Sequence, residues 1–424
     1  MVSASTWMYV AKASGYTLCT FRSNTVPPQP CATGKNLRRN RIFATLLLAA
    51  LASAAFSVPF VFKTQAYTPT TRTYYVAADE VAWDYAPSGI NQITGQAFGS
   101  GAWHLDENTF VGQGPDRIGS VYTKCLYREY TNMNFDNPKI RPEWQHLGTL
   151  GPVIRGVVGD TLVVVFKNNC RIPTTVHPHG VFYLKPSEGA FYNDNDGING
   201  GDYVAPGAMW TYTWPVPQRA GPGPMDPSSI LWMYHGHVDE PGETNAGLIG
   251  PIIITKPSMA RADGNPRDVD REFVNLFTVF DENRSPYIDA NIQTYITDVG
   301  NLVTIDTEVL KADDGFIESN LMHSINGFVY GNGQDINGQL GLTMDLGERV
   351  RWYIIAMGTE VDLHTPHWHG NSLLFAKMRV DVIEVLPGSM KTLDMVPDNP
   401  GTWLYHCHVN DHIDAGMLAL YTVR

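Results

Sequence analysis

Ten of the thirteen histidines in this 424-residue chain lie in four short clusters, a spacing that can hold metal ions. Imidazole binds copper, zinc, iron and nickel, so the histidines alone leave the metal open. A lone buried histidine is usually a satisfied core residue, but four clusters repeated in order along two halves of the chain favour metal ligands. The clusters are His177 and His179; His235 and His237; His364, His367 and His369; and His406, His408 and His412.

The segment WLYHCHVNDHIDAGM, residues 403–417, places a cysteine between two of these histidines. Successive side chains of a strand point to opposite faces, so His406 and His408 are expected on one face and Cys407 on the other. One strand can therefore hold a thiolate-bound metal on one side and two imidazoles on the other.

Cys407 also begins a Cys-x₄-His-x₄-Met pattern that ends at Met417. With one more histidine, Cys407, His412 and Met417 supply the two imidazoles, the thiolate and the weak axial methionine of a blue copper site. The missing histidine has to come from another strand, and His364 is the candidate. The sequence thus favours copper at this position.

The elements that must position these residues are predicted to be β-strands. Runs rich in Val, Ile, Tyr and Trp, bounded by Gly, Pro and Asn, recur along the chain, and long helical periodicity is scarce. A polar linker, residues 256–270, separates two groups of strands, and each group closes with a strand that carries His-x-His. We predict an all-β fold with an internal duplication, in which 72–257 and 270–424 are two Greek-key sandwich or barrel domains.

Residues 1–66 are predicted to be an N-terminal leader. A basic flank precedes the apolar run 42–62, which is long enough to span a bilayer, so the leader is either a signal peptide or a signal-anchor. Residues 1–41 lack Asp and Glu, which leaves organellar targeting open. We expect a secreted or membrane-anchored protein with an extracytoplasmic catalytic region. In such a compartment Cys125 and Cys170 could pair as a disulfide, although their spacing does not show it.

The overall charge and composition exclude some partners. The formal net charge of −12 argues against nucleic acid and against anionic membrane surfaces. The 43% hydrophobic content is enough for a sizeable core, so the chain is not a disordered or collagen-like protein.

The motifs HPHG, YHGHVD, LHTPHWHG and HCHVNDHIDAGM resemble, in this order, the copper motifs of the multicopper oxidases, and within them the ceruloplasmin and hephaestin group. The similarity extends to AGLIGPIIITK, LFTVFDEN and ESNLMHSINGFVYGN, and it covers roughly residues 72–424. It implies cupredoxin-like domains and four coppers per functional unit: one type 1, one type 2 and two type 3. It assigns type 1 copper to His364, Cys407, His412 and Met417; type 2 copper to His177 and His367; and type 3 copper to His179, His235, His237, His369, His406 and His408.

The resemblance also implies how the sites work together. Cys407 receives an electron from the substrate, and His406 and His408 pass it to the trinuclear cluster that reduces dioxygen to water. Gly236 stands where Cys407 would match in the first half, so one type 1 site is expected. Two-domain relatives are ring-shaped homotrimers with one cluster at each subunit boundary, and we expect the same assembly here.

The substrate side of the resemblance points to iron. The iron motif of ceruloplasmin-like proteins matches ESNLMH, which gives Glu318 and His323, and its Asp matches Asp411. Carboxylates with one imidazole suit Fe(II) and stabilise Fe(III) more. The function implied is a ferroxidase with Cys407, Glu318, His323 and Asp411 as catalytic residues. The alternatives are a laccase-like oxidase of phenols or aromatic amines, then a copper nitrite reductase, then a non-catalytic copper-binding protein.

A calcium site is also suggested by the resemblance. The segment LKPSEGAFYNDNDGINGGDY resembles the calcium loop of ceruloplasmin's first domain. Lys185, through its carbonyl, and Asp202 match that pattern, whereas Ile198 and Gly201 replace two other ligands.

Overall fold

The computed structural model describes most of the chain from residue 67 to residue 424, which includes all four histidine clusters. Residues Thr64–Arg424 form one compact unit, and the predicted leader with its apolar run lies outside the described residues. Within the described part, no helix has the length and apolarity needed to cross a bilayer. The described residues are 67–101, 105–194, 200–296, 307–333, 341–359 and 362–424.

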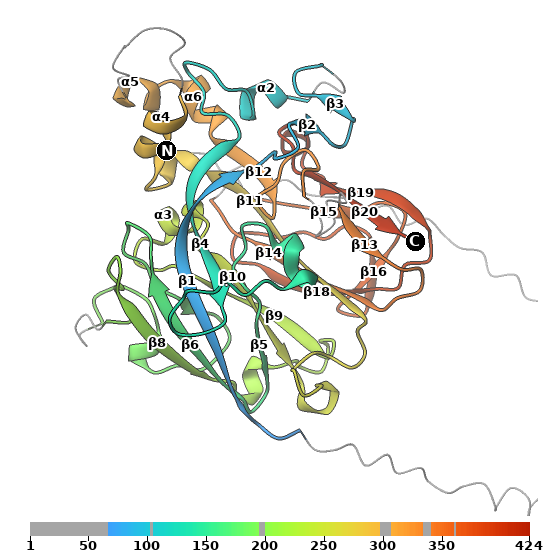
Figure 1. The fold of residues 1–424 in the computed structure, drawn as a ribbon. Coiled ribbons are helices and arrows are strands. Elements are labelled where there is room, and N and C mark those ends of the chain that lie inside the picture. The colour runs from blue at the N-terminus through green and yellow to red at the C-terminus, as the bar shows by residue number, and fades with distance from the viewer. Residues whose placement is uncertain (1–66, 102–104, 195–199, 297–306, 334–340, 360–361) are drawn as a thin grey trace, which may run out of the picture. The chain divides into compact units, whose positions relative to one another are not determined.

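Two four-stranded sheets make up the first half, and their inner faces share one apolar core. The pairs β1–β6 and β5–β10 are parallel, whereas the other neighbours are antiparallel (Figure 1). Every second side chain of β6, TLVVVFKN, is buried, which is the pattern of a strand that packs one face against a core. In sheet order the strands are β4 (Val121–Tyr130), β1 (Thr71–Asp84), β6 (Thr161–Asn168) and β8 (Met209–Pro215), then β5 (Ile154–Val157), β10 (Ile249–Thr255), β9 (Ser229–His235) and β7 (His177–Pro178).

The second half repeats this topology, with the same succession of parallel and antiparallel neighbours. A two-strand extension, β16–β17, is added to the larger sheet. The all-β fold class is therefore confirmed. In sheet order the strands are β12 (Leu321–Ile325), β11 (Arg271–Asp281), β14 (Val350–Ala356), β18 (Met390–Met395), β16 (Leu373–Phe375) and β17 (Met378–Val380), then β13 (Leu342–Met344), β20 (Leu418–Val423), β19 (Gly401–Cys407) and β15 (Pro366–Trp368).

The helices are short and lie in the connections between strands. Asp313 caps α6 by accepting a hydrogen bond from the amide of Phe316 at 2.8 Å, which fixes where that helix begins. The connection between β1 and β4 holds the small hairpin β2–β3, Ile90–Asn91 and Gln96–Ala97. The α-helices are α2 (Glu107–Phe110), α3 (Glu240–Ala246), α4 (Ile288–Tyr295), α5 (Thr307–Lys311), α6 (Asp314–Ser319) and α7 (Asn410–Asp414), and the 3₁₀ turns are η2 (Pro142–Leu147), η3 (Lys185–Ser187), η4 (Gln218–Ala220), η5 (Pro257–Met259) and η6 (Glu282–Arg284).

The two halves pack against each other through a further apolar cluster, to which both contribute. A buried ion pair lies between them: the Lys124 ammonium on β4 donates to the Glu282 carboxylate in η6 and to the carbonyl of Asn245. Next to Lys124, Cys125 forms a disulfide with Cys170, so the pairing that the sequence left open is confirmed.

Substitution of Lys124 with methionine should destabilise the protein by about 3 to 5 kcal/mol, because Glu282 would stay buried without its cation. Chemical denaturation measures this loss. A matched control is Arg171→Met, which breaks the exposed pair with Glu80 and should cost less than about 1 kcal/mol. Equal losses in the two variants would contradict a special role for the buried pair.

Candidate metal centres

A thiol and two imidazoles meet in the core of the second half. Cys407 ends β19, His364 precedes β15, and His412 lies in α7; all three are buried. The Cys407 Sγ lies 3.6 Å from the His412 Nδ1 and 3.9 Å from the His364 Nδ1, and the two nitrogens are 3.1 Å apart. The three donor atoms therefore form a small triangle, which can enclose a single metal ion. We call Cys407, His364 and His412 the thiol site.

Neighbouring groups orient this triangle. The His364 Nε2 donates to the Asp362 carboxylate at 3.2 Å, which leaves Nδ1 facing the sulfur. Asp362 is itself fixed by the amide of Val279 at 2.7 Å. Met417 is fully buried, and its backbone bonds to His412 and Cys407 close the loop between them.

The environment of Cys407 favours the thiolate. Burial alone would raise the pKa of this thiol, but hydrogen bonds from His364, His412 and the amides of Thr365 and Val409 lower it to about 6. A thiolate is the form that binds metals, so the side chain is prepared for a ligand role near neutral pH.

Four further histidines of the second half gather on the other side of β19. His367 on β15 pairs in register with His406 on β19, and their ring nitrogens lie 3.2 Å apart. The His369 Nε2 lies 3.0 Å from the His406 Nε2, and the His408 ring lies 5.3 Å from that of His367. We call these four residues the second tetrad.

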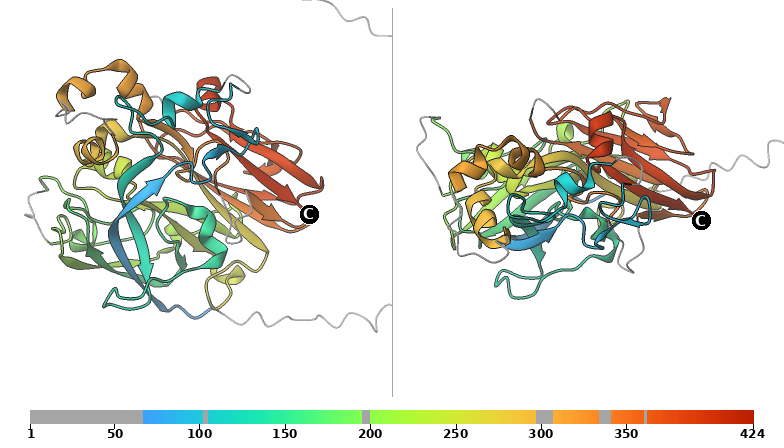
Figure 2. Two further views of the ribbon diagram at one scale, coloured as in Figure 1. Left: turned by 45° about the horizontal axis from the view of Figure 1, so that its top comes forward. Right: turned by 90° about the horizontal axis from the view of Figure 1, so that it is seen from above.

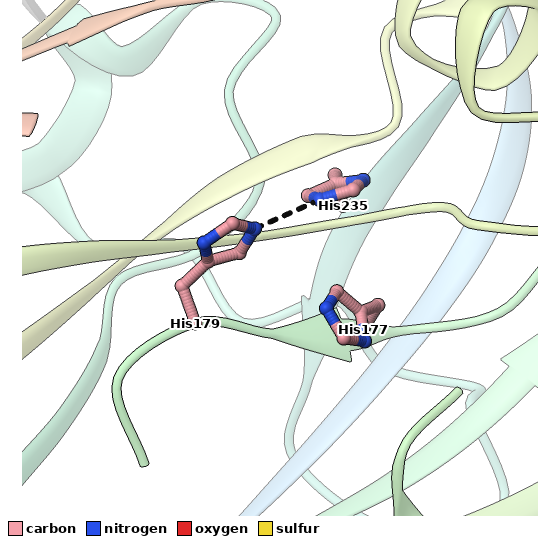
Figure 3. Close-up of side chains that lie close together, drawn as sticks. All are labelled: His177, His179 and His235. Atoms are coloured by element: carbon pink, nitrogen blue, oxygen red, sulfur yellow. Dashed lines mark hydrogen bonds between the residues drawn. The ribbon is translucent and has the colours of Figure 1, made fainter. Parts of the chain in front are cut away.

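The first half carries a matching first tetrad: His177, His179, His235 and His237. His177 on β7 pairs with His235 on β9, in the same relation as His367 with His406. The Nε2 atoms of His179 and His235 lie 3.0 Å apart (Figure 3), and the His237 ring lies 5.0 Å from that of His177.

Burial favours the neutral form of three of these imidazoles, His179, His235 and His406, and the neutral form is the one that coordinates metals. It lowers the pKa of His235 to about 3, and with the nearby His177 it lowers that of His179 to about 4. In the second tetrad, burial lowers the pKa of His406 to about 4.

The comparisons with known proteins agree with this arrangement. Family models described as multicopper oxidase match residues 146–259 and 310–424. The chain is 41% identical over 356 residues to "Ferroxidase HEPHL1" of Homo sapiens. It is 42% identical over 360 residues to ceruloplasmin of Homo sapiens.

The chain belongs to the multicopper oxidases.

Each of these alignments covers 83% of this chain but only 29% and 30% of the two relatives, so the chain spans less than a third of their length. A crystal structure of a multicopper oxidase is 19% identical, with a TM-score of 0.50, and the match covers 84% of this chain and 89% of that chain. This structural likeness supports the predicted cupredoxin-like form of the all-β fold.

Membership of the multicopper oxidases implies copper, and the donor sets fit it. One buried thiolate with two Nδ1 atoms and a nearby methionine is the set preferred by blue copper. The two tetrads offer imidazole donors only, which also suit copper. Within the described residues, each contact between two imidazole rings of the tetrads joins members of the same tetrad.

In the described part of its first half, this multicopper oxidase has no thiol beside its histidines. Gly236 lies between His235 and His237, where Cys407 lies in the second half. A Cβ at Gly236 would come within 2.5 Å of the Glu243 carboxylate, which itself accepts hydrogen bonds from the amides of Val238 and Asp239. The Glu243 carboxylate thus occupies the space into which a side chain at position 236 would point.

The residues matched to the iron site lie around the thiol site but do not form a tight group. His323 on β12 places its ring 5.0 Å from that of His412. Glu318 on α6 and Asp411 on α7 are exposed. Burial, together with the charges of Asp106 and Asp411, raises the pKa of Glu318. Asp106 was not found by sequence reasoning, because it lies in the other half of the chain and in no motif.

The predicted calcium ligands remain a prediction. The Lys185 ammonium bonds to the carboxylates of Glu188 at 2.6 Å and Asp194 at 2.8 Å, and Asp202 is buried. Residues 195–199, which include Ile198, lie outside the described part. Among the described residues, the groups of three or more His, Cys, Asp or Glu side chains close enough to share a metal ion do not include Asp202.

Proposed function

We propose that this chain is a ferroxidase that oxidises Fe(II) to Fe(III) and passes the electrons to dioxygen, which is reduced to water. The observation that carries the proposal is the position of β19 between two centres. Cys407 lies with His364 and His412 on one side, and its covalent neighbour His406 lies in the second tetrad on the other. Bound copper would supply reversible one-electron transfer at both places.

The residues around His412 support iron as the electron donor. Glu318, Asp411 and His323 offer hard oxygen donors and one imidazole beside a histidine of the thiol site. Oxygen donors stabilise the ferric product more than the ferrous substrate, which favours loss of an electron. The name ferroxidase of the HEPHL1 relative is in line with this substrate.

We further propose a homotrimer in which the first tetrad of one subunit meets the second tetrad of the next. Each tetrad opens onto a surface cavity, of about 380 Å³ at His177 and about 670 Å³ at His367. Arg219 lines the first cavity. Asp381, Asp398 and Arg379 line the second, so the excess charge there is acidic and opposite to that of Arg219.

Exposed apolar side chains beside the first tetrad also favour burial against another subunit. Phe182 and Leu184 follow His179 in the chain and are 42% and 69% exposed. A patch of this kind next to a half-site is typical of a subunit interface.

Export from the cytoplasm is part of the proposal. The buried Cys125–Cys170 disulfide supports it, because structural disulfides persist in oxidising compartments.

The double variant Glu318→Ala/Asp411→Ala tests the iron assignment. It removes two carboxylates but no predicted copper ligand, so kcat/KM for Fe(II) should fall about tenfold or more, mainly through KM. Turnover of a bulky phenol, which needs only contact near His412, should stay unchanged. Steady-state oxygen uptake with both donors measures this. Equal losses for both donors, or no loss for iron, would favour the laccase-like oxidase instead.

A further inference from the structure

A cavity of about 550 Å³ lies where the two halves meet, and none of the residues that line it belongs to the thiol site or to a tetrad. The green strands of the first half lie beside the red strands of the second half in both views of Figure 2. The cavity is lined by β1, β5 and η2 from the first half, by β11 from the second, and by the polar linker, residues 256–270, between them. Its volume is in the range of small-molecule sites.

The wall of this cavity is rich in charged side chains. The basic ones are Arg72, Lys139, Arg141, Arg155, Arg261 and Arg271. The acidic ones are Glu143, Asp263, Asp270 and Glu272. Guanidinium groups bind carboxylates and phosphates through paired N–H donors, so a wall with five arginines favours an oxyanion.

Arg261 is the cation of this wall without a carboxylate of its own. Carboxylates outside the wall already pair with Arg72, Arg271, Lys139 and Arg141. Arg261 is exposed, and within the described part of the chain its guanidinium makes no ion pair or side-chain hydrogen bond. Its N–H donors are therefore free to bind an anion that enters the cavity.

Arg155 gives a second, independent sign of a ligand. It is only 6% exposed, and its Nη2 donates to the Glu272 carboxylate at 2.7 Å. Its Nη1 is buried and has no hydrogen-bond partner among the described residues. Buried polar groups almost always have a partner, so a buried donor on a residue that lines a cavity indicates that a ligand supplies the acceptor.

The polar linker brings the arginines together. The Nη1 of Arg72 donates to the carbonyl of Asp263 at 2.8 Å. Gly264 has a φ of 91°, and a Cβ there would come within 3.3 Å of the side chains of Arg72 and Arg155. Glycine thus lets the linker pass directly over both side chains. The amide of Gly264 donates to the carbonyl of Arg261 at 3.0 Å, which places Arg261 in the same turn.

An aromatic ring lines the cavity beside these arginines. The guanidinium carbon of Arg155 lies 5.9 Å from the centre of the Trp144 ring, which is partly exposed. A flat apolar group can pack on such a ring while an oxyanion attached to it reaches the arginines.

We propose that this cavity binds a small organic anion, whose carboxylate or phosphate group contacts Arg155 and Arg261 and whose flat apolar part packs on Trp144. The ligand would contact both halves and the linker, so its binding should stabilise the folded chain. The proposal does not depend on the ferroxidase function.

Isothermal titration calorimetry of the copper-loaded protein with phenyl phosphate and with benzoate tests the site. The two probes carry the same ring on a phosphate and on a carboxylate, so the tighter one identifies the preferred group. Arg261→Gln should weaken binding of that probe about tenfold, as expected for the loss of a charge-assisted hydrogen bond. Arg155→Lys keeps a positive charge beside Glu272 but removes Nη1, and it should weaken binding by a similar factor.

Two further measurements separate this site from general effects of charge. Arg267→Gln is the matched control, because Arg267 is an exposed arginine of the same linker that does not line the cavity, and it should leave the affinity unchanged. Inorganic phosphate, which lacks the ring, should bind the wild-type protein about threefold to tenfold more weakly than phenyl phosphate, and Trp144→Leu should remove that difference.

Thermal unfolding gives a second readout. The preferred probe should raise the Tm of the wild-type protein and of Arg267→Gln, but much less that of Arg261→Gln. Failure of both probes to bind the wild-type protein would overturn the proposal. Binding that Arg261→Gln and Arg155→Lys leave unchanged would place the anion elsewhere, for example at copper, and would overturn it as well.

Discussion

Replacing Cys407 with serine should abolish both the intense blue absorption and the oxidase activity of the copper-loaded protein. The thiol has a pKa lowered to about 6 and lies within 4 Å of two imidazole nitrogens, whereas a serine hydroxyl stays protonated and supplies no soft donor. Electron transfer along β19, from the thiol site through Cys407 to His406, would then stop.

Visible absorption, copper content and oxygen uptake measure the effect. Copper bound by the tetrads should remain, so the copper content should fall only in part. Met417→Leu is the matched control in the same loop; it removes the weak axial donor and should shift the reduction potential while the blue colour persists. Blue absorption in the Cys407→Ser variant would exclude this residue as the copper thiolate.

Co-expression of two inactive variants should restore activity if neighbouring subunits share each cluster. His179→Ala disables the first tetrad and His369→Ala the second, and the two residues hold matching places in HPHG and HWHG. Each variant alone should be inactive, because every interface would lack one imidazole. Roughly three quarters of randomly mixed trimers would hold one intact interface in three, so about a quarter of the wild-type activity should return.

Analytical sedimentation of the same samples reports the assembly. Co-expression of two tagged copies of one variant is the control and should restore nothing. Mixed trimers without activity, or a wild-type monomer that is fully active and holds four coppers, would rule out shared clusters.

The grouping of the candidate ligands was largely predictable from the sequence, because the spacing within each motif fixes which side chains share a face of a strand. Alternation along one strand puts Cys407 and His406 on opposite sides, and strand pairing brings His367 to His406 and His177 to His235. The same local signals predicted the strands. The parallel pairing of strands that are far apart in the sequence, such as β1 with β6 and β11 with β14, could not be predicted from local signals and is known only from the folded chain.

Long-range packing is what the sequence did not reveal. Lys124 and Glu282 form a buried pair, although Lys124 lies in no recognisable motif and the LFTVFDEN segment that holds Glu282 does not indicate its partner. Asp106 likewise has no local signal: its amide bonds to Asp414 and its charge acts on Glu318, both in the other half of the chain. Such contacts depend on how two halves pack, and no periodicity or spacing encodes that.

The crowding at Gly236 constrains how this protein can change over generations. A codon change that introduced cysteine at this position would place its Cβ within 2.5 Å of the Glu243 carboxylate, so that carboxylate would have to move before the thiol could hold a metal. Movement or replacement of Glu243 gives up the bonds from Val238 and Asp239 that hold the turn after His237. A second thiol in the first half is therefore expected to cost stability before it adds a second metal site.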